Sequence, residues 1–140
     1  MNVRDELLFL KEYTLQRWQG GHTMSIQECY AAIEGDFEGT LGRLGSEKLV
    51  ERFALKFLAD ESYPNLIKAM GEENYENAFR AAHTLKGVGL NLGFTRLHEA
   101  SDLLTEALRG GSKPEDNTLL ENVKAAYERT VTVLREYQGA

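Results

Sequence analysis

The sequence predicts an all-α protein, an antiparallel up-and-down four-helix bundle with additional short helices on its N-terminal side. Apolar residues recur at helical spacing along most of the 140 residues, and no stretch alternates apolar and polar residues over the length of a strand. The chain has only two prolines, so long helices can run without interruption. The connections that follow Asn74 are short, which favours antiparallel neighbours.

The N-terminal segment forms the weakest predicted helix, over residues 3–18, because two basic residues interrupt its apolar face. The glycine pair that follows it, at positions 20 and 21, favours a helix stop. We therefore expect residues 1–23 to be a helical extension or linker and residues 24–140 to be the bundle domain. In an alternative interpretation, Met24 is the natural start of the chain.

Two short elements precede the long helices. Ser25 and Glu28 fit a capping box that opens a short helix. Four glycines within residues 35–45 predict a loosely helical connector. Ser46 is a suitable N-cap for the next helix. That helix has a broad apolar stripe of Leu49, Val50, Phe53, Ala54, Phe57 and Leu58.

Four further helices are predicted after this point. Pro64 fits the first turn of a helix that stops at Gly71, and Asn74 caps a helix over residues 75–91. A helix over residues 94–109 follows, and the last long helix begins after Pro114. The stripe of the third comprises Leu97, Ser101, Leu104 and Leu108, and that of the last comprises Leu120, Val123, Tyr127, Val131, Leu134 and Tyr137.

Composition excludes several classes of protein. The net charge of −6 argues against a nucleic-acid binder, which needs a basic surface. No apolar run is long enough to cross a bilayer, and the charged N-terminus does not resemble a signal peptide. Cys29 is the only cysteine, so an intrachain disulfide and a cysteine-based zinc site are excluded. We expect a cytoplasmic monomer without a membrane or nucleic-acid partner.

The helix over residues 75–91 has an unusual outward face. Its core face is predicted to hold Ala78, Ala81, Leu85, Val88, Gly89 and Leu92. His83 lies roughly opposite, together with Phe79, Lys86 and Leu90, and Gly87 lies nearby. Side chains on a helix lean toward its N-terminus, so glycine at position 87 leaves the imidazole open to an incoming group.

This face favours phosphoryl chemistry. A neutral imidazole is a nucleophile that can attack phosphorus, and the Lys86 ammonium can neutralise phosphoryl oxygens. Phe79 and Leu90 would allow a protein partner to seat around His83. The sequence has no nucleotide-binding glycine loop, so we expect a phosphoryl carrier and not an enzyme with its own ATP-binding kinase domain.

The residues from Ala82 to Gly87 (AHTLKG) and from Asn91 to Phe94 (NLGF) resemble the histidine-containing phosphotransfer (HPt) domain of two-component phosphorelays. The resemblance covers about residues 25–137. It implies a four-helix bundle in which His83 accepts a phosphoryl group from a receiver-domain aspartyl phosphate and passes it to another receiver aspartate.

The resemblance also implies the roles of the neighbouring residues. Lys86 would position and neutralise the phosphoryl group, and Gly87 would keep the space beside His83 clear. Phe79, Arg80 and Leu90 would contact the partner, which is a receiver domain or a hybrid sensor histidine kinase. The chain would need no cofactor of its own, because the receiver would supply the magnesium ion. Many members of the family have glutamine or glutamate near the histidine on the next helix, where this sequence has Thr105.

Two alternatives remain open. In the first, the chain is the phosphoacceptor domain of a chemotaxis-type or hybrid histidine kinase, and a kinase phosphorylates His83 in trans. In the second, it is a helical adaptor that binds a protein partner without phosphotransfer. A metal site is disfavoured, because His22, His83 and His98 have no metal-binding spacing.

Overall fold

The computed structural model describes residue 8 and residues 24–139, and these residues form helices and short connections without a strand. The helix predicted over residues 3–18 lies outside the described residues, Leu8 apart. The described helices are α2 (Ile26–Ala32), α3 (Phe37–Leu44), α4 (Glu47–Lys56), α5 (Ser62–Gly71), α6 (Tyr75–Leu92), α7 (Thr95–Leu108) and α8 (Thr118–Gly139), with 3-10 turns η1 (Phe57–Ala59) and η2 (Arg109–Gly111). The predicted all-α class is confirmed for this part of the chain.

The helix starts agree with the predicted capping residues. Ser25 and Glu28 form the reciprocal capping box of α2. The Ser46 hydroxyl accepts the Leu49 N–H at the start of α4, and the Asn74 side chain accepts the Asn77 N–H at the start of α6. These bonds satisfy N–H groups that have no partner within the helix.

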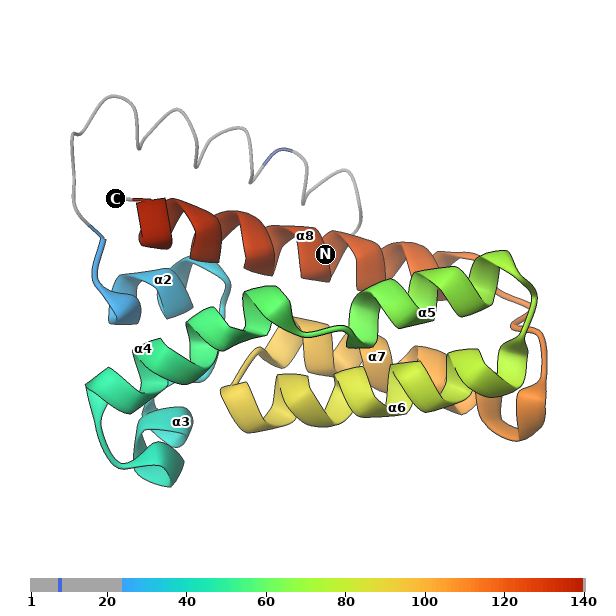
Figure 1. Cartoon of the computed structure of the whole chain (residues 1–140), viewed down its shortest axis with the longest axis horizontal. Coiled ribbons are helices and arrows are strands. Elements are labelled where there is room, and N and C mark those ends of the chain that lie inside the picture. The colour runs from blue at the N-terminus through green and yellow to red at the C-terminus, as the bar shows by residue number, and fades with distance from the viewer. Residues whose placement is uncertain (1–7, 9–23, 140) are drawn as a thin grey trace.

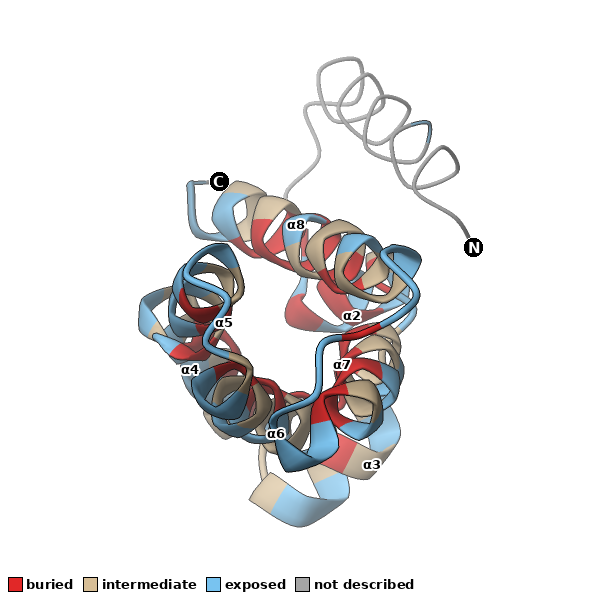
Figure 2. Cartoon of the chain, turned by 90° about the vertical axis from the view of Figure 1, so that its right-hand side faces the viewer, coloured by how far each residue is buried: buried red, intermediate tan, exposed pale blue. Residues whose placement is uncertain are grey.

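Helices α5, α6, α7 and α8 pack against one another in the order of the chain. Helix α6 packs against α5 on one side and α7 on the other, and α7 also packs against α8. Figure 1 shows these helices along the length of the molecule, and Figure 2 shows their buried faces turned toward a common interior. The stripe predicted for residues 94–109 is confirmed, because Leu97, Ser101, Leu104 and Leu108 are all buried.

The short N-terminal helices hold the C-terminal end of α6. The Tyr30 hydroxyl donates to the Leu92 carbonyl (2.6 Å), and the Asp36 N–H donates to the Gly93 carbonyl (2.8 Å). The Arg43 guanidinium donates to the carbonyls of Leu90 and Asn91, both at 3.2 Å. The last carbonyls of α6 therefore have partners from α2, α3 and the turn between them.

Two sequence predictions differ from the structure. Residues 37–44, predicted to be a loosely helical connector, form a regular helix, because the Asp36 carboxylate caps it by accepting the Gly39 N–H. Phe53, predicted in the apolar stripe of α4, is 38% exposed, whereas Val50 and Ala54 are fully buried. The Lys56 ammonium lies 5.8 Å from the centre of the Phe53 ring, an arrangement that a surface aromatic residue can adopt.

Gly93 ends α6 in the left-handed region at φ +72, and we expect it to tolerate no side chain. A Cβ atom there would collide with the Thr40 hydroxyl and the Asp36 carbonyl. Gly45 has a similar φ of +93 but no heavy atom within 4 Å of such a Cβ. Gly45→Ala should therefore lower the free energy of unfolding by about 1 kcal/mol, and Gly93→Ala by about 2 kcal/mol more. Urea unfolding of the two variants tests this, and equal losses would contradict it.

Candidate functional site

Helix α6 carries the candidate site and is anchored by its inner face. Ala78, Ala82, Leu85 and Gly89 are buried along that face. Ala82 was not in the predicted core stripe, whereas Ala81, Val88 and Leu92, which were, are half-buried. The predicted division of the helix into a core face and an outward face is nevertheless confirmed around His83, which is exposed.

The imidazole of His83 is open to solvent on its C-terminal side. Among the residues that the structure describes, none forms a hydrogen bond with this ring. Gly87 lies one turn further along α6, and a Cβ atom added there would meet no heavy atom within 4 Å. No side chain of the described residues therefore occupies the space around Gly87, on this side of His83.

Phe79 flanks the imidazole on the other side. Its ring is nearly parallel to the His83 ring, with an interplanar angle of 11° and 6.1 Å between the centres. The Arg109 guanidinium carbon lies 5.2 Å from the centre of the Phe79 ring. Phe79 is consequently half-buried against the core, and less of it is available to a partner than the sequence predicted.

Lys86 is paired across the helix interface instead of standing free in solvent. Its ammonium Nζ lies 2.8 Å from Asp102 Oδ1 on α7, and its side chain is 28% exposed. This hydrogen bond holds the pKa of the Asp102 carboxyl below its usual value. The sequence reasoning did not single out Asp102, although it lies on the predicted helix over residues 94–109, off the buried stripe.

A comparison with protein-family models gives one match. The model of the Hpt domain matches residues 55–133, which is more than half of the chain and includes α6 and α7 entirely. The chain belongs to the Hpt domain family. Hpt domains carry phosphoryl groups in phosphorelays, where they interact with receiver domains and histidine kinases, and they are not kinases themselves. No curated protein and no solved structure matches the chain.

In this Hpt domain, Thr105 does not replace the glutamine or glutamate that many relatives have near the histidine. Thr105 is fully buried, and its hydroxyl donates to the Ser101 carbonyl at 2.6 Å. Its short side chain is committed to its own helix. The side chain of His83 is therefore held without a hydrogen bond from α7.

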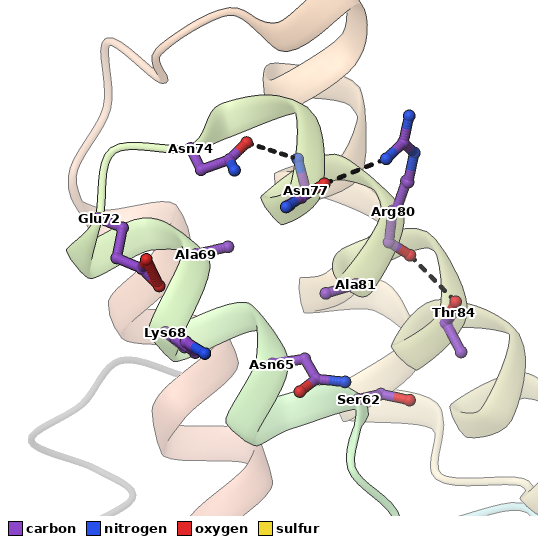
Figure 3. Close-up of a pocket in the computed structure, with 10 residues that line it drawn as sticks. All are labelled: Ser62, Asn65, Lys68, Ala69, Glu72, Asn74, Asn77, Arg80, Ala81 and Thr84. Carbon is purple, nitrogen blue, oxygen red and sulfur yellow. Dashed lines mark hydrogen bonds between the residues drawn. The ribbon is translucent and has the colours of Figure 1, made fainter.

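Arg80 lies on the flank of α6 that faces α5. Its guanidinium donates to the Glu76 carboxylate (2.9 Å) and to the Asn77 side chain (3.1 Å), and it is largely exposed. Beneath it, a polar groove of about 480 Å³ runs between α5 and α6 and includes Lys68 and Thr84 (Figure 3). Arg80 is thus available at the rim of the groove, as a residue that contacts a partner must be.

Leu90 is the other predicted contact residue, and it is 55% exposed. It lies two turns beyond His83 on the same face of α6, close to where Arg43 holds the end of the helix. Exposure of a large apolar side chain beside the candidate site is typical of a protein contact.

None of the helices that the structure describes combines the length and the apolar character that a membrane span requires.

Proposed function

We propose that this chain is a histidine phosphotransfer protein in which His83 accepts a phosphoryl group from a receiver-domain aspartyl phosphate and passes it to another receiver aspartate. The observation that carries the proposal is the exposed His83 imidazole in the matched region, with open space at Gly87 on one side. A receiver must bring its aspartyl phosphate to within about 3–3.5 Å of the attacking nitrogen, which requires such an unobstructed approach.

The transfer is not a redox reaction and needs no electron-carrying cofactor, and it needs no external base because the attacking nitrogen is already unprotonated. The unprotonated ring nitrogen of His83 attacks phosphorus. A P–N bond forms as the bond between phosphorus and the carboxyl oxygen of the receiver aspartate breaks. The receiver aspartate leaves as a carboxylate, and the other ring nitrogen of His83 keeps its hydrogen. The reverse sequence of bond changes returns the group to a receiver aspartate. The ammonium of Lys86, one turn along α6, is proposed to neutralise the phosphoryl oxygens.

The magnesium ion of the reaction is proposed to come with the receiver. The side chains assigned to the site are an imidazole and an ammonium beside a glycine, whereas Mg²⁺ prefers carboxylate oxygens and water. The aspartyl phosphate and the carboxylates around it on a receiver would supply such ligands. We therefore assign this chain no cofactor of its own.

The receiver is proposed to dock over the outward face of α6. Leu90 would bury its exposed side chain against the partner, Phe79 would form the floor beside His83, and Arg80 would contact acidic groups of the partner. Rim charges of this kind affect the rate and specificity of association more than the affinity. Arg80 is thus proposed to help select among receivers.

A bundle of helices is proposed to hold these residues in place. Helices α5–α8 would form the antiparallel up-and-down four-helix bundle of residues 24–140, and residues 1–23 would be an extension or linker. The protein would act as a monomer in the cytoplasm, between receiver domains or between a hybrid sensor histidine kinase and a receiver, without a membrane or nucleic-acid partner.

Phosphoryl transfer from a labelled, phosphorylated receiver domain of the same organism tests the proposal. We expect the chain to become labelled, and we expect the label to be lost in acid and retained in alkali, because a phosphoramidate has this stability. The label should pass on to a second, unlabelled receiver.

Two other results would contradict this function. Label from an ATP-bound histidine kinase but from no receiver would favour a phosphoacceptor domain phosphorylated in trans. Label from neither donor would favour the adaptor, in which α6 binds a partner by packing alone.

A further inference from the structure

We propose that Asp102 is a positioning residue for Lys86: its carboxylate holds the ammonium while His83 is unphosphorylated, and competes with the phosphoryl oxygens for it afterwards. This inference rests on the proposed phosphotransfer at His83. The competition between the Asp102 carboxylate and the phosphoryl oxygens for the Lys86 ammonium shifts the transfer equilibrium toward the receiver.

The geometry separates this ion pair from the surface pairs that form within a single helix. Lys86 and Asp102 lie on different helices, 2.8 Å apart, and the lysine side chain is 28% exposed. Lys124 and Glu121, by contrast, are neighbours on one helix at 3.3 Å, and the lysine is 38% exposed. Packing of α6 against α7 therefore holds the two ends of the Lys86–Asp102 pair in register.

The neighbours of Asp102 on α7 have hydrogen-bond partners other than the Lys86 ammonium. One turn before it, His98 Nδ1 lies 3.0 Å from the Lys86 carbonyl, and since a carbonyl only accepts, Nδ1 carries the hydrogen. One turn after it, both carboxylate oxygens of Glu106 accept bonds from Arg109, at 2.7 and 3.1 Å. Of the two carboxylates on this face of α7, Asp102 and Glu106, it is consequently Asp102 that contacts the Lys86 ammonium.

Phosphorylation of His83 changes the competition for the ammonium. A phosphoryl group brings up to two negative charges to a point one helical turn from Lys86, and Coulomb attraction draws the ammonium toward it. The Asp102 carboxylate continues to attract the Lys86 ammonium, and it also repels the phosphoryl group. Phosphohistidine is thereby less stable than it would be with a free lysine, which favours return of the group to an aspartate.

Asp102→Asn tests the inference, with Glu106→Gln as the matched control. Both changes remove one carboxylate charge from the same row of α7, but only Asp102 contacts Lys86. The measurement is the equilibrium ratio of phosphorylated chain to phosphorylated receiver. We expect Asp102→Asn to raise this ratio about fivefold, because the attraction between the ammonium and the carboxylate, about 1 kcal/mol for two charges a few ångströms apart in water, no longer opposes the movement of Lys86 toward the phosphoryl group. Glu106→Gln should change it less than twofold, and Asp102→Glu should remain near the wild-type value.

A double-mutant cycle with Lys86→Gln separates lysine positioning from simple repulsion. If Asp102 acts through Lys86, most of the effect of Asp102→Asn disappears in the Lys86→Gln background. An Asp102→Asn ratio equal to that of wild type or of Glu106→Gln would overturn the inference, as would an effect that persists fully without Lys86. These results leave the proposed function intact, because the wild-type chain is still labelled. Absence of label on the wild-type chain would overturn both.

Discussion

Replacing His83 with glutamine is expected to abolish labelling by a phosphorylated receiver, to below one part in a thousand of the wild-type rate. The glutamine amide has no basic nitrogen that attacks phosphorus, so the P–N bond cannot form. His83 is exposed and accepts no hydrogen bond from a described residue, so the substitution should change the free energy of unfolding by less than about 0.5 kcal/mol. Thermal unfolding monitored by circular dichroism checks that the variant remains folded.

His98→Gln is the matched control for this experiment. His98 is half-buried on α7, and its Nδ1 donates to the Lys86 carbonyl, a bond that a glutamine amide can also make. This variant should therefore retain its label. Label that persists in His83→Gln but is lost in His98→Gln would move the phosphorylation site from α6 to α7.

The helices and the exposure of His83 were predictable because they depend on local patterns. A capping side chain such as Asn74 satisfies N–H groups in its own first turn, and the stripe through Leu97 and Leu104 follows from helical periodicity alone. Gly87 was informative for the same reason, since the direction in which helical side chains lean is a property of one helix.

The contacts between helices were not predictable from these patterns. Periodicity places Lys86 on the outer side of α6, but the register between α6 and α7 decides that Asp102 pairs with it. In the same way, η2 brings Arg109 over the Phe79 ring, which makes Phe79 half-buried. The sequence places Thr105 near His83 on the next helix, but periodicity does not show that its hydroxyl donates to the Ser101 carbonyl within its own helix.

Gly87→Leu is expected to lower the rate of phosphoryl transfer by about 100-fold while leaving the fold intact. The leucine side chain would lean toward the N-terminus of α6 and cover the open side of His83. A receiver would then be unable to bring phosphorus into line with the ring nitrogen, and a misplacement of about 1 Å suffices for a loss of this size. No heavy atom lies within 4 Å of a Cβ added at this position, so the substitution meets no obstacle where the side chain leaves the backbone.

Substitution at Gly87 is expected to slow phosphoryl transfer without lowering the free energy of unfolding. Glycine inside a helix costs about 0.5–1 kcal/mol relative to alanine, so Gly87→Ala should stabilise the protein by that amount. At Gly89 a Cβ would lie 3.2 Å from the backbone nitrogen of His98, so Gly89→Ala should be destabilising. Gly71 ends α5 and has no heavy atom within 4 Å of an added Cβ, which makes Gly71→Leu the control for a leucine elsewhere on the surface.

The combination of slower transfer and unchanged or raised stability distinguishes a clearance role for Gly87 from a structural one. If Gly87 served packing, loss of transfer and loss of stability would occur together, as they should for Gly89→Ala. The rates are measured by label transfer from the receiver, and the free energies of unfolding by urea titration. A Gly87→Leu variant that transfers as fast as Gly71→Leu would show that receivers do not approach His83 from this side.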